Sequence, residues 1–132
     1  MNNIESEFVP YQQSLELKEI GFDEPCLAKY NRESNFVLDN SSLFCRNKHP
    51  LLDKLNQVST PFYQQAFKWF RNKYKLFSSI ERESAEHFFC NYSIKEYDGI
   101  KNIDHRGKGY RKEEEAELAC LNKLIEIIKT RN

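Results

Sequence analysis

An apolar stripe near the C-terminus restricts the fold of this chain most strongly. Its members recur at spacings of three, one, four, three and one residues: Ala116, Ala119, Cys120, Leu124, Ile127 and Ile128. This spacing is typical of the buried face of an α-helix. Glutamates at 113–115 occupy the first turn, where carboxylates meet the positive end of the helix dipole. The pattern predicts a helix over 112–129 that must pack against another element.

Two further helices are predicted upstream. Apolar and aromatic side chains recur every four residues over 61–74, from Phe62 to Tyr74, and Pro61 suits a first helical turn. An earlier helix should begin near Pro10 and end at Gly21, since glycine readily adopts the left-handed conformation that closes a helix.

The remaining segments favour strands and connections. Residues 26–30 and 35–38 flank a polar turn, and 76–83 and 87–96 flank another, so each pair predicts an antiparallel hairpin. Residues 39–59 form a long connection with one helical turn at 51–55, and 97–112 form a polar loop. The order α-ββ-α-ββ-α predicts a single α+β domain over 1–132. Its antiparallel sheet of about four strands would carry helices on one face.

Composition narrows the classes of function. Twenty basic residues balance 20 acidic ones, which disfavours a dedicated nucleic-acid binder, because phosphate contacts supply most of the affinity in that class. No apolar run reaches the ~18 residues of a membrane span. The polar, acidic N-terminus does not resemble a secretion signal. We therefore expect a cytoplasmic protein in which Cys26, Cys45, Cys90 and Cys120 stay reduced and mostly buried.

Candidate metal-binding and catalytic residues are sparse. Cys45, His49, His87 and Cys90 have the side chains of a zinc site, but residues three apart in a strand, such as His87 and Cys90, point to opposite faces. Cys45 and His49 form the one local nucleophile–base pair. The acids Asp98 and Asp104 lie in the polar loop, which does not look rigid enough to hold a catalytic geometry. We expect no metal, no cofactor and no catalytic residues. A hydrolase or metalloprotein is the third hypothesis.

The loop over 101–112 is the candidate binding surface. It holds five basic residues, two glycines that bring backbone N–H groups near an anion, and a tyrosine that could stack on a base. The candidate binding residues are Arg106, Lys108, Tyr110, Arg111 and Lys112. The alternative is that this loop is simply a solvated connection.

Two resemblances bear on function. The C-terminal half resembles a double-stranded RNA-binding domain in its order of elements, but the glutamates at 113–115 would repel phosphates where that family places cations. Four segments resemble an uncharacterised protein family of Bacteroidetes phages, prophages and mobile elements: 7–11 (EFVPY), 15–26 (LELKEIGFDEPC), 61–71 (PFYQQAFKWFR) and 114–126 (EEAELACLNKLIE).

The second resemblance implies an accessory protein in the cytoplasm of a bacterial host. Small phage proteins of this kind often act by binding, and some inhibit host enzymes or defence systems. We therefore expect a non-enzymatic protein that binds a host or phage protein and that could itself form a homodimer. The alternative is a small nucleic-acid-binding module that uses the loop over 101–112.

Overall fold

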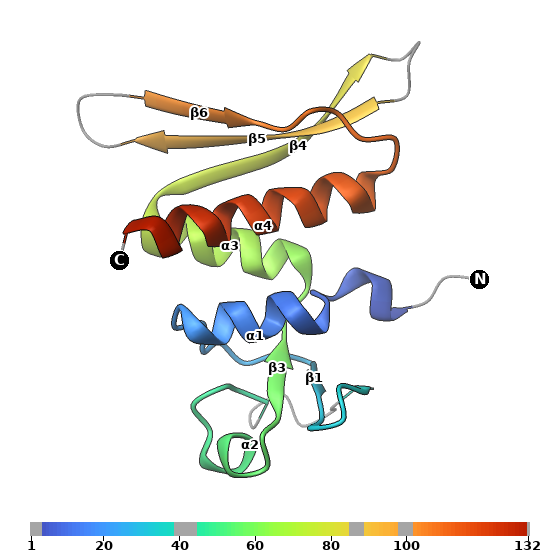
Figure 1. The fold of residues 1–132 in the computed structure, drawn as a ribbon, viewed down its shortest axis with the longest axis vertical. Helices are drawn as coiled ribbons and strands as arrows, with labels where there is room; N and C mark the ends of the chain where they lie inside the picture. The colour runs from blue at the N-terminus through green and yellow to red at the C-terminus, as the bar shows by residue number, and fades with distance from the viewer. Residues whose placement is uncertain (1–3, 39–44, 85–88, 98–101, 132) are drawn as a thin grey trace. The chain divides into compact units, whose positions relative to one another are not determined.

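The computed structural model describes residues 4–38, 45–84, 89–97 and 102–131 of the chain (Figure 1). It divides into two compact units, residues 1–65 and residues 66–132. The boundary falls within helix α3 (Tyr63–Tyr74), whose first turn belongs to the first unit and whose remainder belongs to the second.

The first unit is built on a small antiparallel sheet. Its strands β1 (Ala28–Tyr30), β2 (Phe36–Leu38) and β3 (Val58–Thr60) lie in the order β2-β1-β3. Around them lie a short 3-10 helix (Ile4–Glu7), α1 (Tyr11–Glu19) and α2 (Pro50–Lys54). Three buried hydroxyl groups, those of Ser14, Tyr30 and Thr60, donate to the carbonyl of Val9 and tie α1 to two strands of the sheet.

The end of α1 follows the prediction from its sequence. Gly21 has a φ of 103°, the left-handed conformation that glycine adopts without steric cost. The N–H of Phe22 then turns back to the carbonyl of Leu17 at 2.9 Å, so one of the last carbonyls of the helix has a partner. The side chains of Leu17 and Phe22 are buried here.

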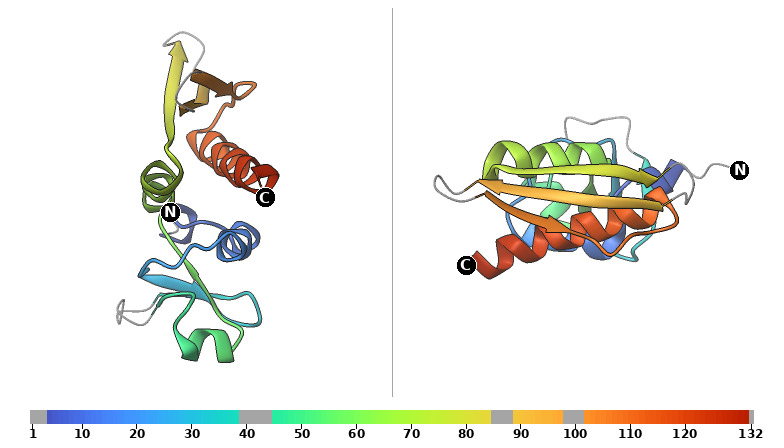
Figure 2. Two further views of the ribbon diagram at one scale, coloured as in Figure 1. Left: turned by 90° about the vertical axis from the view of Figure 1, so that its left-hand side faces the viewer. Right: turned by 90° about the horizontal axis from the view of Figure 1, so that it is seen from above.

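The second unit has longer strands. β4 (Leu76–Ser84), β5 (Phe89–Tyr97) and β6 (Asn102–Arg106) form an antiparallel sheet in that order. Helix α4 (Glu113–Arg131) packs against β5 and β4, and its buried residues are mainly the stripe seen in the sequence. The helices α3 and α4 lie side by side on one side of this sheet (Figure 2).

The α+β class is confirmed, as are antiparallel pairing and both predicted hairpins. The prediction of one sheet with about four strands is wrong, because each hairpin gains a third strand of its own. β3 lies in the predicted connection over 39–59, and β6 lies in the predicted loop over 97–112. β3 pairs with β1 and β6 pairs with β5, and the two hairpins belong to separate three-stranded sheets.

In the part of the chain that the structure describes, no helix is long and apolar enough to span a membrane. The single domain predicted from the sequence stays a prediction, which the number of unfolding transitions would test.

Candidate functional site

The predicted basic site is held against β5 by close packing. A β-carbon on Gly107 would lie 2.6 Å from Asn91 Oδ1 and from a ring carbon of Tyr92, so glycine is required here. The carbonyl of Gly107 accepts a hydrogen bond of 2.9 Å from Asn91 Nδ2. Gly109 has a φ of 93° and open space around it. Gly107 is therefore packed closely against β5. We call residues 106–112 the ridge.

Tyr110 anchors this ridge. Its N–H donates to the carbonyl of Cys90 at 2.7 Å, and its own carbonyl accepts from the N–H of Cys90 at 2.8 Å. Its ring stacks on that of Tyr92, with the ring centroids 6.3 Å apart and an interplanar angle of 23°. One face of the ring is thus already covered, which argues against Tyr110 as an open platform for a nucleic-acid base.

The charges around the ridge cancel. Arg106 Nε lies 3.3 Å from Asp104 Oδ2, and the side chains of Lys108, Arg111 and Lys112 are exposed. The glutamates at 113–115 are exposed in the first turn of α4. Four predicted cations therefore share this end of the unit with four carboxylates.

A second basic region was not singled out from the sequence. Lys75 follows α3 directly, and the next residue, Leu76, pairs with Glu96 near the end of β5. Glu96 in turn bonds to Arg131 at the end of α4. This path brings together the C-terminal ends of α3, β5 and α4. We call the exposed cations there the helix-end cluster: Arg71, Lys73, Lys75, Lys129 and Arg131.

Glu96 is the carboxylate at the base of this cluster. Its side chain is 15% exposed, and it bonds to Arg131 and lies 3.1 Å from His105 Nε2. Hydrogen bonding from the Arg131 guanidinium, with a further contribution from His105, lowers the pKa of the Glu96 carboxyl despite its burial. The negative charge of Glu96 is therefore already engaged.

The zero net charge of the chain conceals an uneven distribution. Residues 66–132 hold 14 Lys and Arg against 11 Asp and Glu, a net charge of +3. Residues 1–65 hold 6 against 9, a net charge of −3. The neutrality of the whole chain therefore does not disfavour binding of a polyanion by the second unit.

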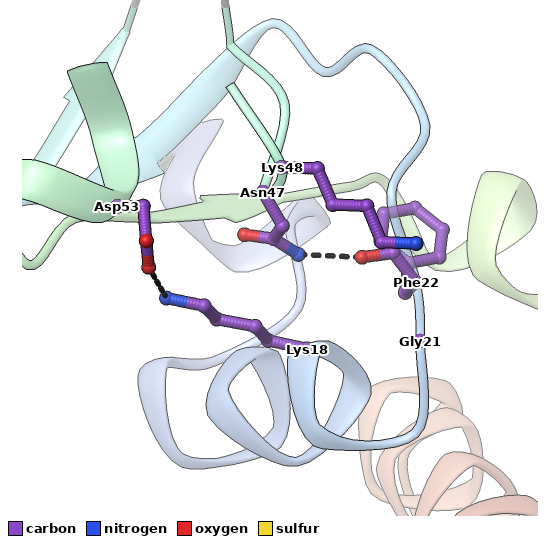
Figure 3. A pocket seen from close by; sticks show the side chains of 6 residues that line it. All are labelled: Lys18, Gly21, Phe22, Asn47, Lys48 and Asp53. Carbon is purple, nitrogen blue, oxygen red and sulfur yellow. Dashed lines mark hydrogen bonds and ion pairs between the residues drawn. The ribbon is translucent and has the colours of Figure 1, made fainter. Parts of the chain in front are cut away.

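The first unit contains a pocket of about 330 Å³ (Figure 3). An ion pair of 3.7 Å joins Lys18 of α1 to Asp53 of α2 across it. Asn47 is buried, donates to the carbonyl of Phe22 and accepts from the N–H of Ser59. Because both ends of its amide join chain segments, we assign Asn47 a structural role.

Strand β2 presents apolar side chains at an edge of the first sheet. Val37 is 37% exposed and Leu38 is 51% exposed. Among the described residues, no strand pairs with the outer side of β2. The turn that precedes β2 is pre-formed, since Asn31 Oδ1 accepts from the N–H groups of Glu33 and Asn35.

The candidate metal ligands have other structural partners. Cys45 is buried and donates to the carbonyl of Ala28 at 3.0 Å, and His49 Nδ1 accepts from the N–H of Leu51 at the start of α2. His87 and Asp98 lie outside the described residues. Within the described ranges, no three His, Cys, Asp or Glu side chains are grouped to hold a metal ion.

The thiol groups are buried, as predicted. Burial raises the pKa of Cys26 and of Cys120 to about 12. The thiolate is the reactive form of cysteine, so these two side chains are poor nucleophiles at neutral pH.

Comparison with family models, with curated proteins and with solved structures found no match to this chain.

Proposed function

We propose that the protein is a non-enzymatic accessory protein, of the phage or mobile-element type, that acts in the host cytoplasm by binding a host or phage protein. The observation that carries this proposal is the exposed apolar edge at β2. Edge strands with exposed apolar side chains favour pairing with another chain, and soluble proteins usually protect them with charges, proline or a covering element.

The register of the β1–β2 hairpin determines which backbone N–H and C=O groups of β2 point away from β1. Asn31 donates to the carbonyl of Asn35 at 3.0 Å, and Lys29 pairs with Val37 two residues further along. In an antiparallel pair of strands, hydrogen-bonded residue pairs alternate with pairs that are not hydrogen-bonded. Asn31 and Asn35 form a hydrogen-bonded pair, so Lys29 and Val37 form the next one, and the N–H and C=O of Val37 point toward β1. Those of Phe36 and Leu38 point outward. An extended segment of a partner can therefore add to β2 through backbone hydrogen bonds, and the side chains of Val37 and Leu38 add apolar contact.

Proline at position 38 tests this mode of binding. Leu38→Pro removes an outward N–H without removing a hydrogen bond to β1, and proline is tolerated on edge strands for that reason. The matched control is Leu51→Lys, at an exposed apolar position on α2. We expect tagged wild-type protein and the control to recover the same partner from host or infected cells, as identified by mass spectrometry. Leu38→Pro should lose that partner.

Recovery of the same partner by Leu38→Pro would contradict binding at β2. If the partner is a second copy of the chain, light scattering should show a dimer for the wild type and a monomer for Leu38→Pro. Circular dichroism of each variant checks that the fold is kept.

The alternative is a nucleic-acid-binding module that uses residues 101–112. The ridge and the +3 charge of the second unit support it. The carboxylates of Asp104 and of 113–115 weaken it, because they cancel the positive potential where phosphates would bind.

A further inference from the structure

We propose a second binding surface, independent of β2: the helix-end cluster binds the phosphate backbone of a double-stranded nucleic acid. Four cations of the cluster lie in the last turns of two helices that lie side by side, and the fifth, Lys75, directly follows α3 (Figure 2). The contacts from Leu76 to Glu96 and from Glu96 to Arg131 fix the ends of those helices together.

The potential at this end stays positive after the opposing charges are counted. The C-terminal ends of two helices contribute about −0.5 charge each. Glu96 contributes one further negative charge, and it is mostly buried under Arg131. Arg71, Lys73, Lys75 and Arg131 against these terms leave about +2. Around residues 106–112 the four cations face four flanking carboxylates, those of Asp104 and of 113–115, so the helix-end cluster is the stronger site for a polyanion.

Contacts with residues of α3 restrict two lysine side chains of the cluster: Lys75 Nζ donates to the carbonyl of Asn72 at 3.3 Å, and Lys73 lies over two aromatic rings. Lys73 Nζ lies 5.1 Å from the centre of the Trp69 ring and 5.5 Å from that of Tyr74, which restricts its long side chain. Arg71 is exposed one turn before the end of α3, and Lys75 follows the helix with a φ of 58°. No platform for an unstacked base is needed, so recognition would depend on backbone charge and not on sequence.

A paired charge-removal experiment tests the site. Arg71→Gln with Lys75→Gln removes two cations of the helix-end cluster, and Lys108→Gln with Arg111→Gln removes two from the ridge. Affinity for fluorescein-labelled DNA and RNA duplexes of about 20 base pairs is measured by anisotropy from about 50 to 200 mM salt. We expect a wild-type slope of about −3 to −4 in log K against log salt, and a slope smaller by about 2 for the helix-end variant.

We further expect the helix-end variant to bind about tenfold more weakly at low salt, while the ridge variant changes less than twofold. An equal loss in both variants, or a loss in the ridge variant alone, would overturn the assignment. No duplex binding by wild-type protein at about 50 mM salt would also overturn it. Binding to vesicles of anionic lipid with none to duplexes would assign the cluster to a membrane surface instead. None of these outcomes depends on β2, which Leu38→Pro tests separately.

Discussion

The two units of this protein differ in how they achieve stability and in what they present to solvent. The first has three strands of three residues each, held by hydroxyl groups that converge on the carbonyl of Val9. It is acidic overall, and apolar side chains are exposed at β2. The second has two nine-residue strands under a 19-residue helix and is basic overall. A neutral composition can therefore conceal two units of opposite net charge.

Removing a buried leucine from each unit gives the largest expected effect. Leu17 in the first unit and Leu124 in the second are both fully buried, so each replacement by alanine should cost about 3 kcal/mol. Because the boundary lies within α3, we expect one thermal transition in calorimetry that both replacements lower. Two transitions, each lowered by one replacement only, would contradict the single domain predicted from the sequence.

Two glycine replacements in the second unit compare a closely packed position, Gly107, with an open one, Gly109. Gly107→Ala forces a β-carbon against Asn91 and the two stacked tyrosines, so we expect a loss of about 2 kcal/mol in unfolding free energy. The β-carbon added by Gly109→Ala meets no neighbouring atom. The expected loss in unfolding free energy is about 1 kcal/mol and comes only from the φ of 93°. Urea denaturation measures both. Equal losses would show that packing around Gly107 is looser than described.

The contacts of Glu96 should make the unfolding free energy of the second unit depend on pH. Because its pKa is lowered in the folded state, Glu96 contributes stability that is present above its unfolded pKa of about 4.3 and is lost as pH falls through the folded pKa. Glu96→Gln should cost about 1.5 kcal/mol at pH 7, and the difference from wild type should shrink as the pH falls below about 4. A difference that stays constant across this range in urea denaturation would contradict the account.

The sequence predicted the elements that carry strong periodicity. The stripe of α4 and the pattern of α3 each require a buried face, and the structure shows one for each. The strand predicted over 87–96 is also present as β5, but its residues 90–94 are buried on both faces. Gly21 was sufficient to locate the end of α1. Helix periodicity and a helix-ending glycine are local signals, because they depend on residues that are close together in the sequence.

Strands β3 and β6 had no such signal. Val58, Ser59 and Thr60 are all buried, so β3 shows no alternation, and β6 holds one apolar residue among five. Both strands exist because a hairpin already offers an edge to pair with, which is a tertiary effect. Five residues of the basic ridge were predicted, but the sequence could not show that Tyr110 stacks on Tyr92. The helix-end cluster was missed because its members are up to 60 residues apart (71 and 131) and meet only through the register of β4 with β5.

Amide hydrogen exchange of the full chain, with and without a DNA duplex, tests most directly whether the two units carry separate binding surfaces. The account predicts added protection at the C-terminal ends of α3 and α4, around Arg71 and Arg131, and no change at β2. Added protection confined to residues 106–112, or appearing at Phe36–Leu38, would contradict it.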